Sequence, residues 1–328
     1  MKLTITFFLL IHSLIGFSQL DSLPPALQGK IIRSYADDGD KTIVGIKGEA
    51  QGDGTIYFHQ KLYGAEWQIL NQGKALGDTS MDVQAVAFVN DSIYLAGTWK
   101  TGLYRSSNKG ASWNRLMDFP SNDIRAIRVS DSKPKIVYAA TTTKGILKSI
   151  DLGLTWLQCA HDSLNKSLAS WSLELNPSDP SIIYLATFGQ GIKRSTDGGS
   201  TWSQVLRPEG TIQLFDMTFS TKKPKRMWAV GSGDGIQALY YSKNSGETWK
   251  TVSNAPEAAL NTIGILNGKK ERLILGTWED GAFIQTKKGW KKLDQIPFEV
   301  ISGIECGFMN TKILTWGNGI YTLLNTEL

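Results

Sequence analysis

The 328-residue sequence has little of the chemistry on which hydrolases and metalloenzymes depend. It contains three histidines and two cysteines, and neither His59 nor His161 lies beside a Gly-x-Ser-x-Gly segment or a candidate thiol nucleophile. It also lacks His-Glu-x-x-His, Cys-x-x-Cys and any phosphate-cradling glycine loop that opens a helix. A Ser-His-Asp or Cys-His nucleophile is therefore unsupported, and we expect neither a metal nor a cofactor.

The two cysteines and the densest acidic cluster also have structural explanations. Cys159 and Cys306 lie far apart in the chain. A disulfide between them is possible in an oxidising compartment, but we expect two buried thiols. Residues 37–40, Asp-Asp-Gly-Asp, lack the later acidic ligands of a calcium loop. We expect them to form a β-turn.

Long hydrophobic runs are missing, apart from one at the amino end. Residues 3–17 are mostly apolar and follow Met1 and Lys2, with small residues before a cleavage point near Ser18. This run is too short to span roughly 30 Å of hydrocarbon. We therefore expect residues 1–18 to be a cleaved signal peptide and residues 19–328 to form one exported domain. We expect that domain to be periplasmic or secreted, without stable membrane insertion.

Neither sign of charge dominates the chain. There are 35 Lys and Arg against 30 Asp and Glu, which gives a net charge of +5 and a pI near 9.0. The basic residues are spread along the whole chain, and an exported protein seldom meets DNA. We interpret the charge as solvation and expect a monomer with no nucleic-acid partner.

What the sequence does contain is a repeated motif. Residues 195–202, Ser-Thr-Asp-Gly-Gly-Ser-Thr-Trp, share the pattern S-x-D-x-G-x-T-W with residues 149–156, and two further copies carry Asn in place of Asp. The motif positions are Ser106, Asn108, Gly110 and Trp113; Ser149, Asp151, Gly153 and Trp156; Ser195, Asp197, Gly199 and Trp202; and Ser242, Asn244, Gly246 and Trp249. Decayed copies end at Trp67 and Trp290. These tryptophans recur every 41 to 47 residues, a period typical of a repeated supersecondary unit.

Each motif residue suits a hairpin turn. The Asp or Asn side chain is expected to accept from backbone N–H groups about two residues on, and the Gly to supply a positive φ. The Ser and Thr hydroxyls tie the strands together, and the Trp begins the next strand and buries its ring.

This motif resembles the Asp-box, or BNR, repeat of sialidases, xyloglucanases, sortilin-type receptors and photosystem II stability/assembly factor-like proteins. The resemblance implies an all-β fold, a β-propeller of four-stranded blades. It also implies that each box joins the third and fourth strands of a blade, on the face away from the usual active site. The same box serves hydrolases, receptors and assembly factors, so it does not choose among these functions.

Short strands at regular spacing, with no convincing segment of 3.6-residue period, exclude an α/β enzyme architecture. We predict innermost blade strands at residues 83–88, 124–129, 171–175, 214–219, 262–266 and 301–306, and a hairpin from 31–35 and 42–47. The motif tryptophans give six blades, and residues 301–324 give a seventh with three strands. We expect the segment 26–32 to supply the fourth strand, so that the amino- and carboxyl-terminal strands close the ring. Six or eight blades remain as alternatives.

A second pattern, Thr-x-x-x-Gly or a close variant, lies between the second and third strands of six blades. Its first variable position holds Trp99, Thr142, Phe188, Ser232, Trp278 and Trp316, and its third holds a polar residue each time. These loops are expected around the mouth of the central channel, opposite the motif hairpins. The candidate ligand-binding residues are Trp99, Lys100, Phe188, Gln190, Asp234, Trp278, Asp280, Trp316 and Asn318. Alternatively, the aromatic residues only pack the blades against one another.

Two functions remain open. The first is a non-catalytic binding or assembly module that holds a protein segment or glycan on this loop face. The second is a glycoside hydrolase, sialidase- or xyloglucanase-like, with Asp234, Glu279 and Asp280 as candidate acids. We favour the first, because the chain lacks the early Arg-Ile-Pro motif of sialidases and holds one propeller where xyloglucanases have two.

Overall fold

A computed structural model describes most of the chain after residue 26. The described residues are 27, 29–47, 55–60, 67–70, 82–131, 136–159, 170–187, 189–210, 212–233, 235–267, 270–294, 296, 300–307, 310–317 and 319–324. The predicted signal peptide lies outside this range. Within the described residues, no helix is long and apolar enough to cross a membrane.

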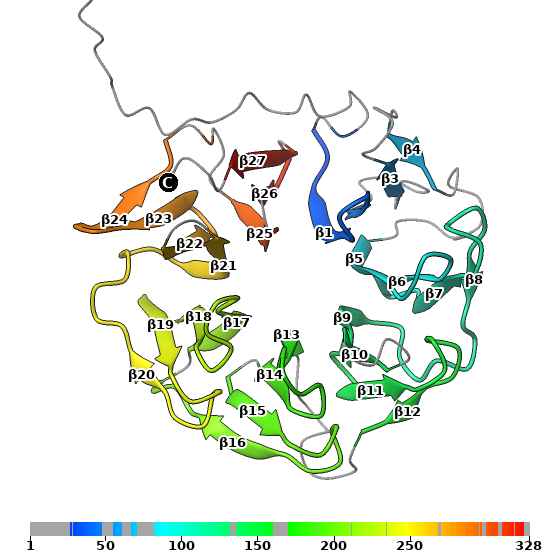
Figure 1. Ribbon diagram of the computed structural model, residues 1–328, viewed down its shortest axis with the longest axis horizontal. Coiled ribbons are helices and arrows are strands. Elements are labelled where there is room, and N and C mark those ends of the chain that lie inside the picture. Colours follow the sequence, from blue (N-terminus) through cyan, green and yellow to red (C-terminus); the bar gives the residue numbers. More distant parts are fainter. Residues whose placement is uncertain are drawn as a thin grey trace, which may run out of the picture.

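The described strands form seven antiparallel sheets that stand as blades around a central channel (Figure 1). The first three blades are β1 (Ile32–Asp37), β2 (Lys41–Ile46), β3 (Ile56–Gln60) and β4 (Gln68–Ile69); β5 (Asp82–Phe88), β6 (Tyr94–Trp99), β7 (Leu103–Ser106) and β8 (Asn114–Arg115); and β9 (Ile124–Val129), β10 (Val137–Thr141), β11 (Ile146–Ser149) and β12 (Leu157–Gln158). The next two are β13 (Ser170–Leu175), β14 (Ile183–Thr187), β15 (Gly191–Ser195) and β16 (Ser203–Leu206); and β17 (Gln213–Phe219), β18 (Met227–Gly233), β19 (Ile236–Ser242) and β20 (Lys250–Thr251). The last two are β21 (Leu260–Asn267), β22 (Glu271–Thr277), β23 (Ala282–Thr286) and β24 (Gly289–Lys292); and β25 (Ile301–Cys306), β26 (Asn310–Thr315) and β27 (Ile320–Leu324).

The prediction of an all-β, seven-bladed propeller is confirmed. The first strand of each blade lies innermost, and the predicted innermost segments correspond to β5, β9, β13, β17, β21 and β25. The predicted hairpin is β1 and β2, and its turn is built as expected, because Asp37 and Asp38 accept hydrogen bonds from the N–H groups of Gly39 and Lys41.

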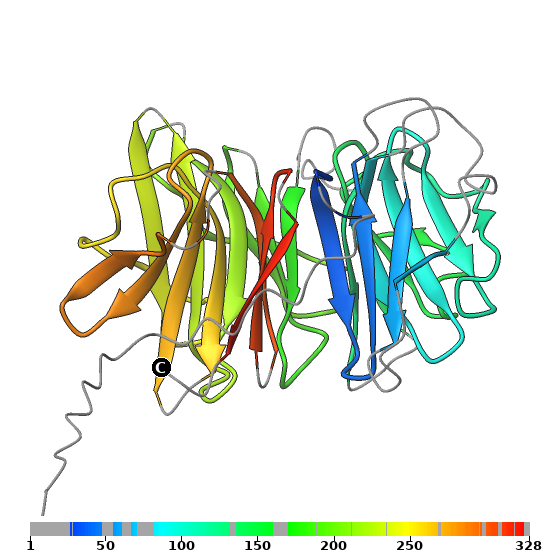
Figure 2. The ribbon, with the colours of Figure 1, turned by 90° about the horizontal axis from the view of Figure 1, so that it is seen from above.

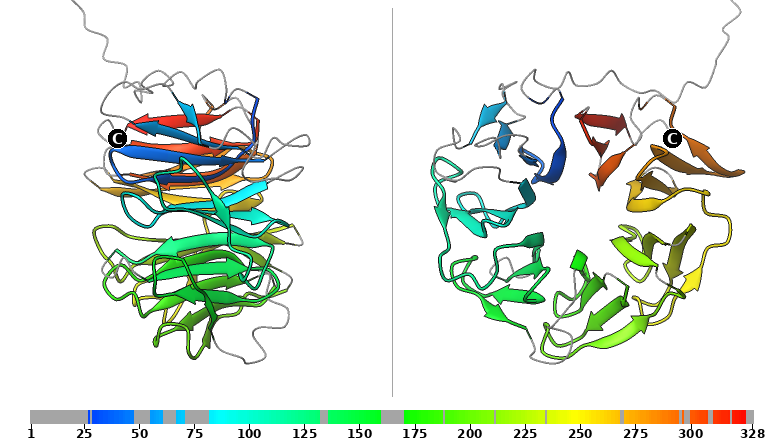
Figure 3. Two further views of the ribbon diagram at one scale, coloured as in Figure 1. Left: turned by 90° about the vertical axis from the view of Figure 1, so that its right-hand side faces the viewer. Right: turned by 180° about the vertical axis from the view of Figure 1, so that it is seen from behind.

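The ring closes between the seventh blade and the first, which lie side by side (Figures 1 and 3). Ile31 forms a single bridge with Trp316, and the fully buried Leu27 packs with Leu314 and Ile320. Ile32 itself begins β1. Residues 1–26 and 28 lie outside the described part, and the seventh sheet has three strands in the part that is described. The closing fourth strand therefore stays a prediction.

The hydrophobic core is divided among the spaces between neighbouring blades. The second strands β10 and β14 are buried along their whole length, because both faces of these strands meet another sheet. Blades approach closely where a strand has no side chain: a Cβ on Gly97 of β6 would lie 2.5 Å from Cγ2 of Ile124 in the next blade. Such contacts fix the spacing of the blades.

The motif hairpins join the third and fourth strands of their blades. Ser195 donates to Asp197 and accepts from the N–H of Gly199, whose φ of 95° requires glycine. Asp197 Oδ1 accepts from the N–H of Thr201, four residues on, so the expectation of about two residues is wrong. The longer reach allows one carboxylate to bridge the whole loop. The indole N–H of Trp202 then donates to the carbonyl of Gly199.

The two ends of the ring carry different loops. Because each blade is an antiparallel meander, the connections from first to second and from third to fourth strand share one face. The connections from second to third strand, and those between blades, share the other (Figure 2). The motif hairpins and the Thr-x-x-x-Gly loops therefore lie on opposite faces.

The two cysteines are free thiols, as expected, but only one of them is buried. Cys159 and Cys306 are both unpaired, Cys159 buried and Cys306 half-buried. Burial raises the pKa of the Cys159 thiol to about 11 and that of Cys306 to about 12. Neither thiol is therefore a nucleophile at neutral pH.

Candidate functional site

The Thr-x-x-x-Gly pattern builds the loops at one end of the channel. In five blades the threonine hydroxyl donates to the glycine carbonyl four residues on, at 2.6 to 2.9 Å, and the threonine is fully buried. These threonines are Thr98, Thr141, Thr187, Thr277 and Thr315. The pattern is thus explained by the turn itself, and the tryptophans that follow Thr98, Thr277 and Thr315 are presented at the channel mouth.

Every innermost strand carries a β-bulge at the same place, near its first residues. The pairing register skips one residue in β1, β5, β9, β13, β17, β21 and β25. The skipped residues are Arg33, Gln84, Arg125, Trp171, Phe215, Asn261 and Ser302. All seven line one cavity of about 200 Å³ in the channel. A bulge re-aims a side chain, and here seven bulges aim seven side chains at one space.

Bulge residues and loop residues join into a continuous surface that we name the mouth belt. It consists of Trp99, Arg125, Trp171, Phe215, Trp278, Trp316 and Arg33, in order around the ring. The guanidinium carbon of Arg125 lies 3.7 Å from the ring centroid of Trp99 and 4.7 Å from that of Trp171. A residue of β9 therefore links the second and fourth blades.

The rest of the mouth belt is mainly aromatic. Phe215 lies 5.7 Å from Trp278, and Trp278 lies 6.4 Å from Trp316, between ring centroids. The guanidinium carbon of Arg33 lies 4.8 Å from the Trp316 ring and the ammonium of Lys47 lies 5.7 Å from it. The five aromatic side chains are half-buried, so part of each ring stays open to the channel mouth.

The two belt arginines are held by carboxylates. Arg33 lies 3.3 Å from Asp82, and Arg125 lies 3.3 Å from Asp123. Asp123 also accepts a hydrogen bond from the Thr142 hydroxyl. Burial lowers the pKa of the Arg125 guanidinium and raises that of the Asp82 carboxyl, although Arg33 opposes the latter shift. The cations of the mouth are therefore fixed in place and largely neutralised.

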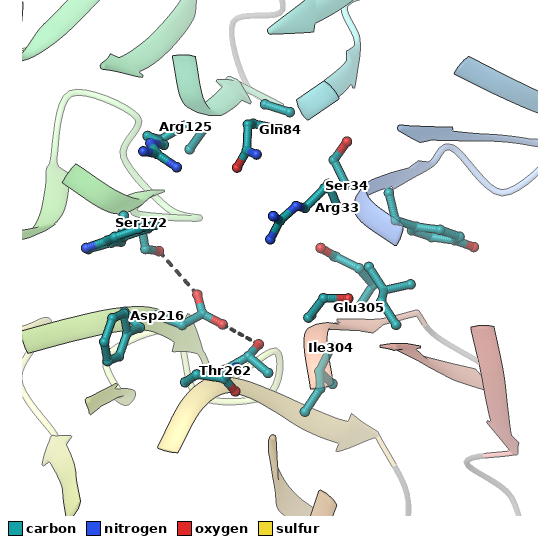
Figure 4. Close-up of a pocket in the computed structure, with 18 of the residues that line it drawn as sticks. Arg33, Ser34, Gln84, Arg125, Ser172, Asp216, Thr262, Ile304 and Glu305 are labelled. Carbon is teal, nitrogen blue, oxygen red and sulfur yellow. Dashed lines mark hydrogen bonds between the residues drawn. The ribbon is translucent and has the colours of Figure 1, made fainter. Parts of the chain in front are cut away.

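Deeper in the channel the wall becomes acidic (Figure 4). Arg128 donates two hydrogen bonds to one carboxylate oxygen of Glu174, at 3.1 and 2.7 Å. Asp216 and Glu305 also line the cavity, and Figure 4 shows Glu305 beside Arg33. Burial, with help from Asp216 and Glu174, raises the pKa of Glu305 to about 7 although Arg128 opposes it.

The sequence-predicted residues fall into three groups. Trp99, Trp278 and Trp316 belong to the mouth belt. Lys100 and Gln190 are exposed on their loops, as is Glu279; Asp280 is half-buried and donates its N–H to Thr277. Phe188, Asp234 and Asn318 lie outside the described residues. Of the acids proposed from sequence, the described ones, Glu279 and Asp280, do not line the cavity.

The bulge residues and the channel acids were missed from sequence. The only signal of the bulge residues was a polar or aromatic residue directly after the buried first residues of a strand, and this resembles ordinary strand alternation. Nothing in a single repeat marks Arg33, Arg125 or Glu305 as facing the channel. Within the described residues, no group of three or more His, Cys, Asp or Glu side chains is arranged to hold a metal.

The comparisons with known proteins agree with this architecture. Residues 149–260 match the model of the sortilin family, described as sortilin, neurotensin receptor 3. A comparison with curated protein sequences finds no match. The family match, over residues 149–260, agrees with the sortilin-like repeat that the motif suggested.

Solved propellers resemble the chain at low sequence identity. A GH74 xyloglucanase from Xanthomonas campestris matches with a TM-score of 0.69 and 12% identity over 90% of this chain, which spans only 52% of that enzyme. YCF48 bound to D1 peptide matches with a TM-score of 0.67 and 14% identity, over 90% of this chain and 94% of that one. The WD40 propeller of Doa1 matches with a TM-score of 0.62 and 15% identity, over 90% and 93%. These likenesses show the fold.

Proposed function

We propose that the chain is an exported, non-catalytic β-propeller module that binds a protein segment or glycan at the mouth of its central channel. The observation that carries this proposal is the mouth belt, which joins side chains from all seven blades into one surface. Half-exposed aromatic faces beside fixed polar groups are typical of surfaces that bind sugars or peptides.

The belt is also pre-organised for binding. Each belt arginine is held between an aromatic ring and a carboxylate, and five of the loops are closed by a buried threonine. Rigid surfaces lose little conformational entropy when a ligand binds, which favours affinity. Among the similar structures, one is of YCF48 bound to D1 peptide, so a propeller of this size and shape is seen with a peptide.

The hydrolase alternative keeps only Asp234, outside the described residues, among its three sequence-based candidates. Glu279 is exposed and Asp280 is half-buried on its loop, and neither lines the cavity. The xyloglucanase that resembles the chain is nearly twice as long as the part matched, so its activity does not transfer. Binding without turnover is therefore the function that we propose.

The test is a binding screen with the chain from Gln19 onward, on glycan and peptide arrays, run beside release assays on the same sugars. We expect binding without release, lost in a Trp99→Ala/Trp278→Ala double variant. Trp202→Ala, in a motif hairpin on the opposite face, is the matched control and should bind as the wild type does. Sugar release by the wild-type chain, or a double variant that binds normally, would contradict the proposal.

A further inference from the structure

The charges that line the cavity do not cancel. Its three arginines each have a carboxylate partner: Arg33 has Asp82, Arg125 has Asp123, and Arg128 has Glu174. Two further carboxylates, on Asp216 and Glu305, line the same cavity. With these three partners counted, five carboxylates stand against three arginines, so the carboxylates of Asp216 and Glu305 have no paired arginine.

Asp216 is satisfied by hydrogen bonds, but all of its donors are neutral. Its Oδ1 accepts from the Ser172 hydroxyl at 3.2 Å and from the N–H of Met217 at 2.9 Å. Its Oδ2 accepts from the Thr262 hydroxyl at 2.8 Å and from the N–H of Ile263 at 3.0 Å. These bonds fix the carboxylate on the wall of the channel (Figure 4) and leave its charge without a counter-ion.

Glu305 has neither a hydrogen bond nor an ion pair with any residue that the structure describes. Its side chain is exposed, but to the interior of the channel, where the surrounding wall still desolvates it. The nearby cation Arg128 is engaged by Glu174, and Lys312, opposite Glu305 in the β25–β26 register, donates to the Thr322 hydroxyl at 2.7 Å. The carboxylate of Glu305 is therefore available to a group that enters from outside.

The other groups near Glu305 do not neutralise it. On β1, the Tyr35 hydroxyl donates to Asp37, and the guanidinium of Arg33 is paired with Asp82. Asp216 on β17 and Glu174 on β13 are themselves acids, and both raise the pKa of Glu305.

A second, independent feature of the cavity is a pair of buried oxygen atoms that lack a hydrogen-bond partner in the described part of the chain. Asn261 is only 7% exposed, and its Nδ2 donates to the carbonyl of Ile301 at 2.7 Å. Its Oδ1 has no hydrogen-bond partner among the described residues, and neither has the buried hydroxyl oxygen of Ser302 beside it in the next blade. Both residues line the cavity, at the bulge positions of β21 and β25. A buried acceptor without a donor is costly unless a ligand supplies one.

We propose that this cavity takes a positively charged side chain, that of an arginine or lysine, from a protein segment bound at the mouth belt, with its cation paired to Glu305. The cation passes the faces of Phe215 and Trp278, which line the entrance and attract positive charge. The inference rests on the proposed function and narrows its ligand to a basic protein segment.

The test compares two probes that differ only in charge: the peptide Ac-Gly-Arg-Gly-NH2 and its citrulline counterpart, titrated into the full chain at about pH 8. We expect the arginine peptide to bind on the order of tenfold more tightly, as for a hydrogen bond to a charged group. The preference should disappear in Glu305→Gln and shrink toward about pH 5.5, where Glu305, with its pKa of about 7, takes up a proton. Glu257→Gln, at an exposed carboxylate of the loop before β21, is the control that removes the same charge and should keep the preference.

The outcomes separate this inference from the proposed function. Equal binding of both peptides, lost in Trp278→Ala, overturns the cation site and leaves the mouth as a binding surface. An arginine preference that survives in Glu305→Gln also overturns it. If neither peptide binds, the cation site is refuted, and the array screen decides the proposed function on its own.

Discussion

The central carbon of the Arg125 guanidinium lies over the ring of Trp99 in the preceding blade, 3.7 Å from its centroid. One residue comes from a bulge in an innermost strand and the other from a Thr-x-x-x-Gly loop. The contact ties two blades together at the surface that we propose for binding. A guanidinium that already stacks on one ring and pairs with Asp123 has little freedom left to lose when a ligand arrives.

Arg125→Ala should lower the free energy of unfolding by about 2 kcal/mol, since it removes a cation–π contact and leaves Asp123 without its partner. Arg125→Lys should recover only part of this loss, because an ammonium keeps the charge but cannot stack as a planar guanidinium does. Urea unfolding of both variants measures the difference. The control is Arg125→Met with Asp123→Asn, which should be more stable than Arg125→Ala. Equal stability of the wild type and Arg125→Lys would contradict the stacking argument.

The sequence was sufficient for the fold because the fold is repeated. The motif tryptophans and the Thr-x-x-x-Gly loops each recur several times at regular spacing. Comparing the repeats with one another therefore gave the bounds of strands such as β9 and β25 as the structure has them. Three of the mouth tryptophans, Trp99, Trp278 and Trp316, were found in the same way. Arg33, Arg125 and Glu305 were not, because most other blades hold different residue types at the equivalent positions.

The side chains that face the channel are set by β-bulges and by closure of the ring, and neither can be seen in a single sequence. A β-bulge changes the direction of a side chain without a residue type of its own: the seven bulge residues include arginine, glutamine, tryptophan, phenylalanine, asparagine and serine. The pairing of Arg128 with Glu174 also joins residues 46 apart in neighbouring blades. Only the closed ring brings such residues together.

Gly97→Ala tests how closely the blades are packed. The added Cβ would lie 2.5 Å from Cγ2 and 2.8 Å from Cβ of the fully buried Ile124, so one blade must move. We expect a loss of about 1 to 3 kcal/mol in the free energy of unfolding, as for an overpacked core. Thermal unfolding of Gly97→Ala, with and without Ile124→Ala, measures it. If the second substitution does not reduce the effect of the first, the clash is not its cause.

Glu305 should make stability depend on pH in an unusual direction for a carboxyl group. Its folded pKa of about 7 lies above its ordinary value of 4.5, so the folded state holds its proton more tightly than the unfolded state does. The favourable contribution is complete below about pH 4.5 and is lost as the pH rises through 7. The melting temperature of Glu305→Gln minus that of the wild type should therefore increase as the pH rises from about 5 to about 8. A constant difference across this range would show that the pKa is not raised.

The motif hairpins offer a matched pair of substitutions at Asp197. Its carboxylate accepts from the hydroxyl and the N–H of Thr201, and these bonds lower its pKa to about 2. The contribution to stability is therefore present above about pH 4 and lost as the pH falls toward 2.

Asp197→Ala should cost about 1 kcal/mol of unfolding free energy at neutral pH, because the acceptor for these donors is removed. Asp197→Asn should cost less. In the equivalent loops, Oδ1 of Asn108 and of Asn244 accepts the corresponding backbone hydrogen bond, from the N–H of Ser112 and of Thr248. Chemical unfolding at about pH 7 and pH 3 separates the variants, and the asparagine variant should lose less stability than the wild type on acidification. Ligand binding should be unchanged in both, because the hairpins lie on the face opposite the channel mouth. A folded Asp197→Ala chain that no longer binds would contradict this division between the two faces.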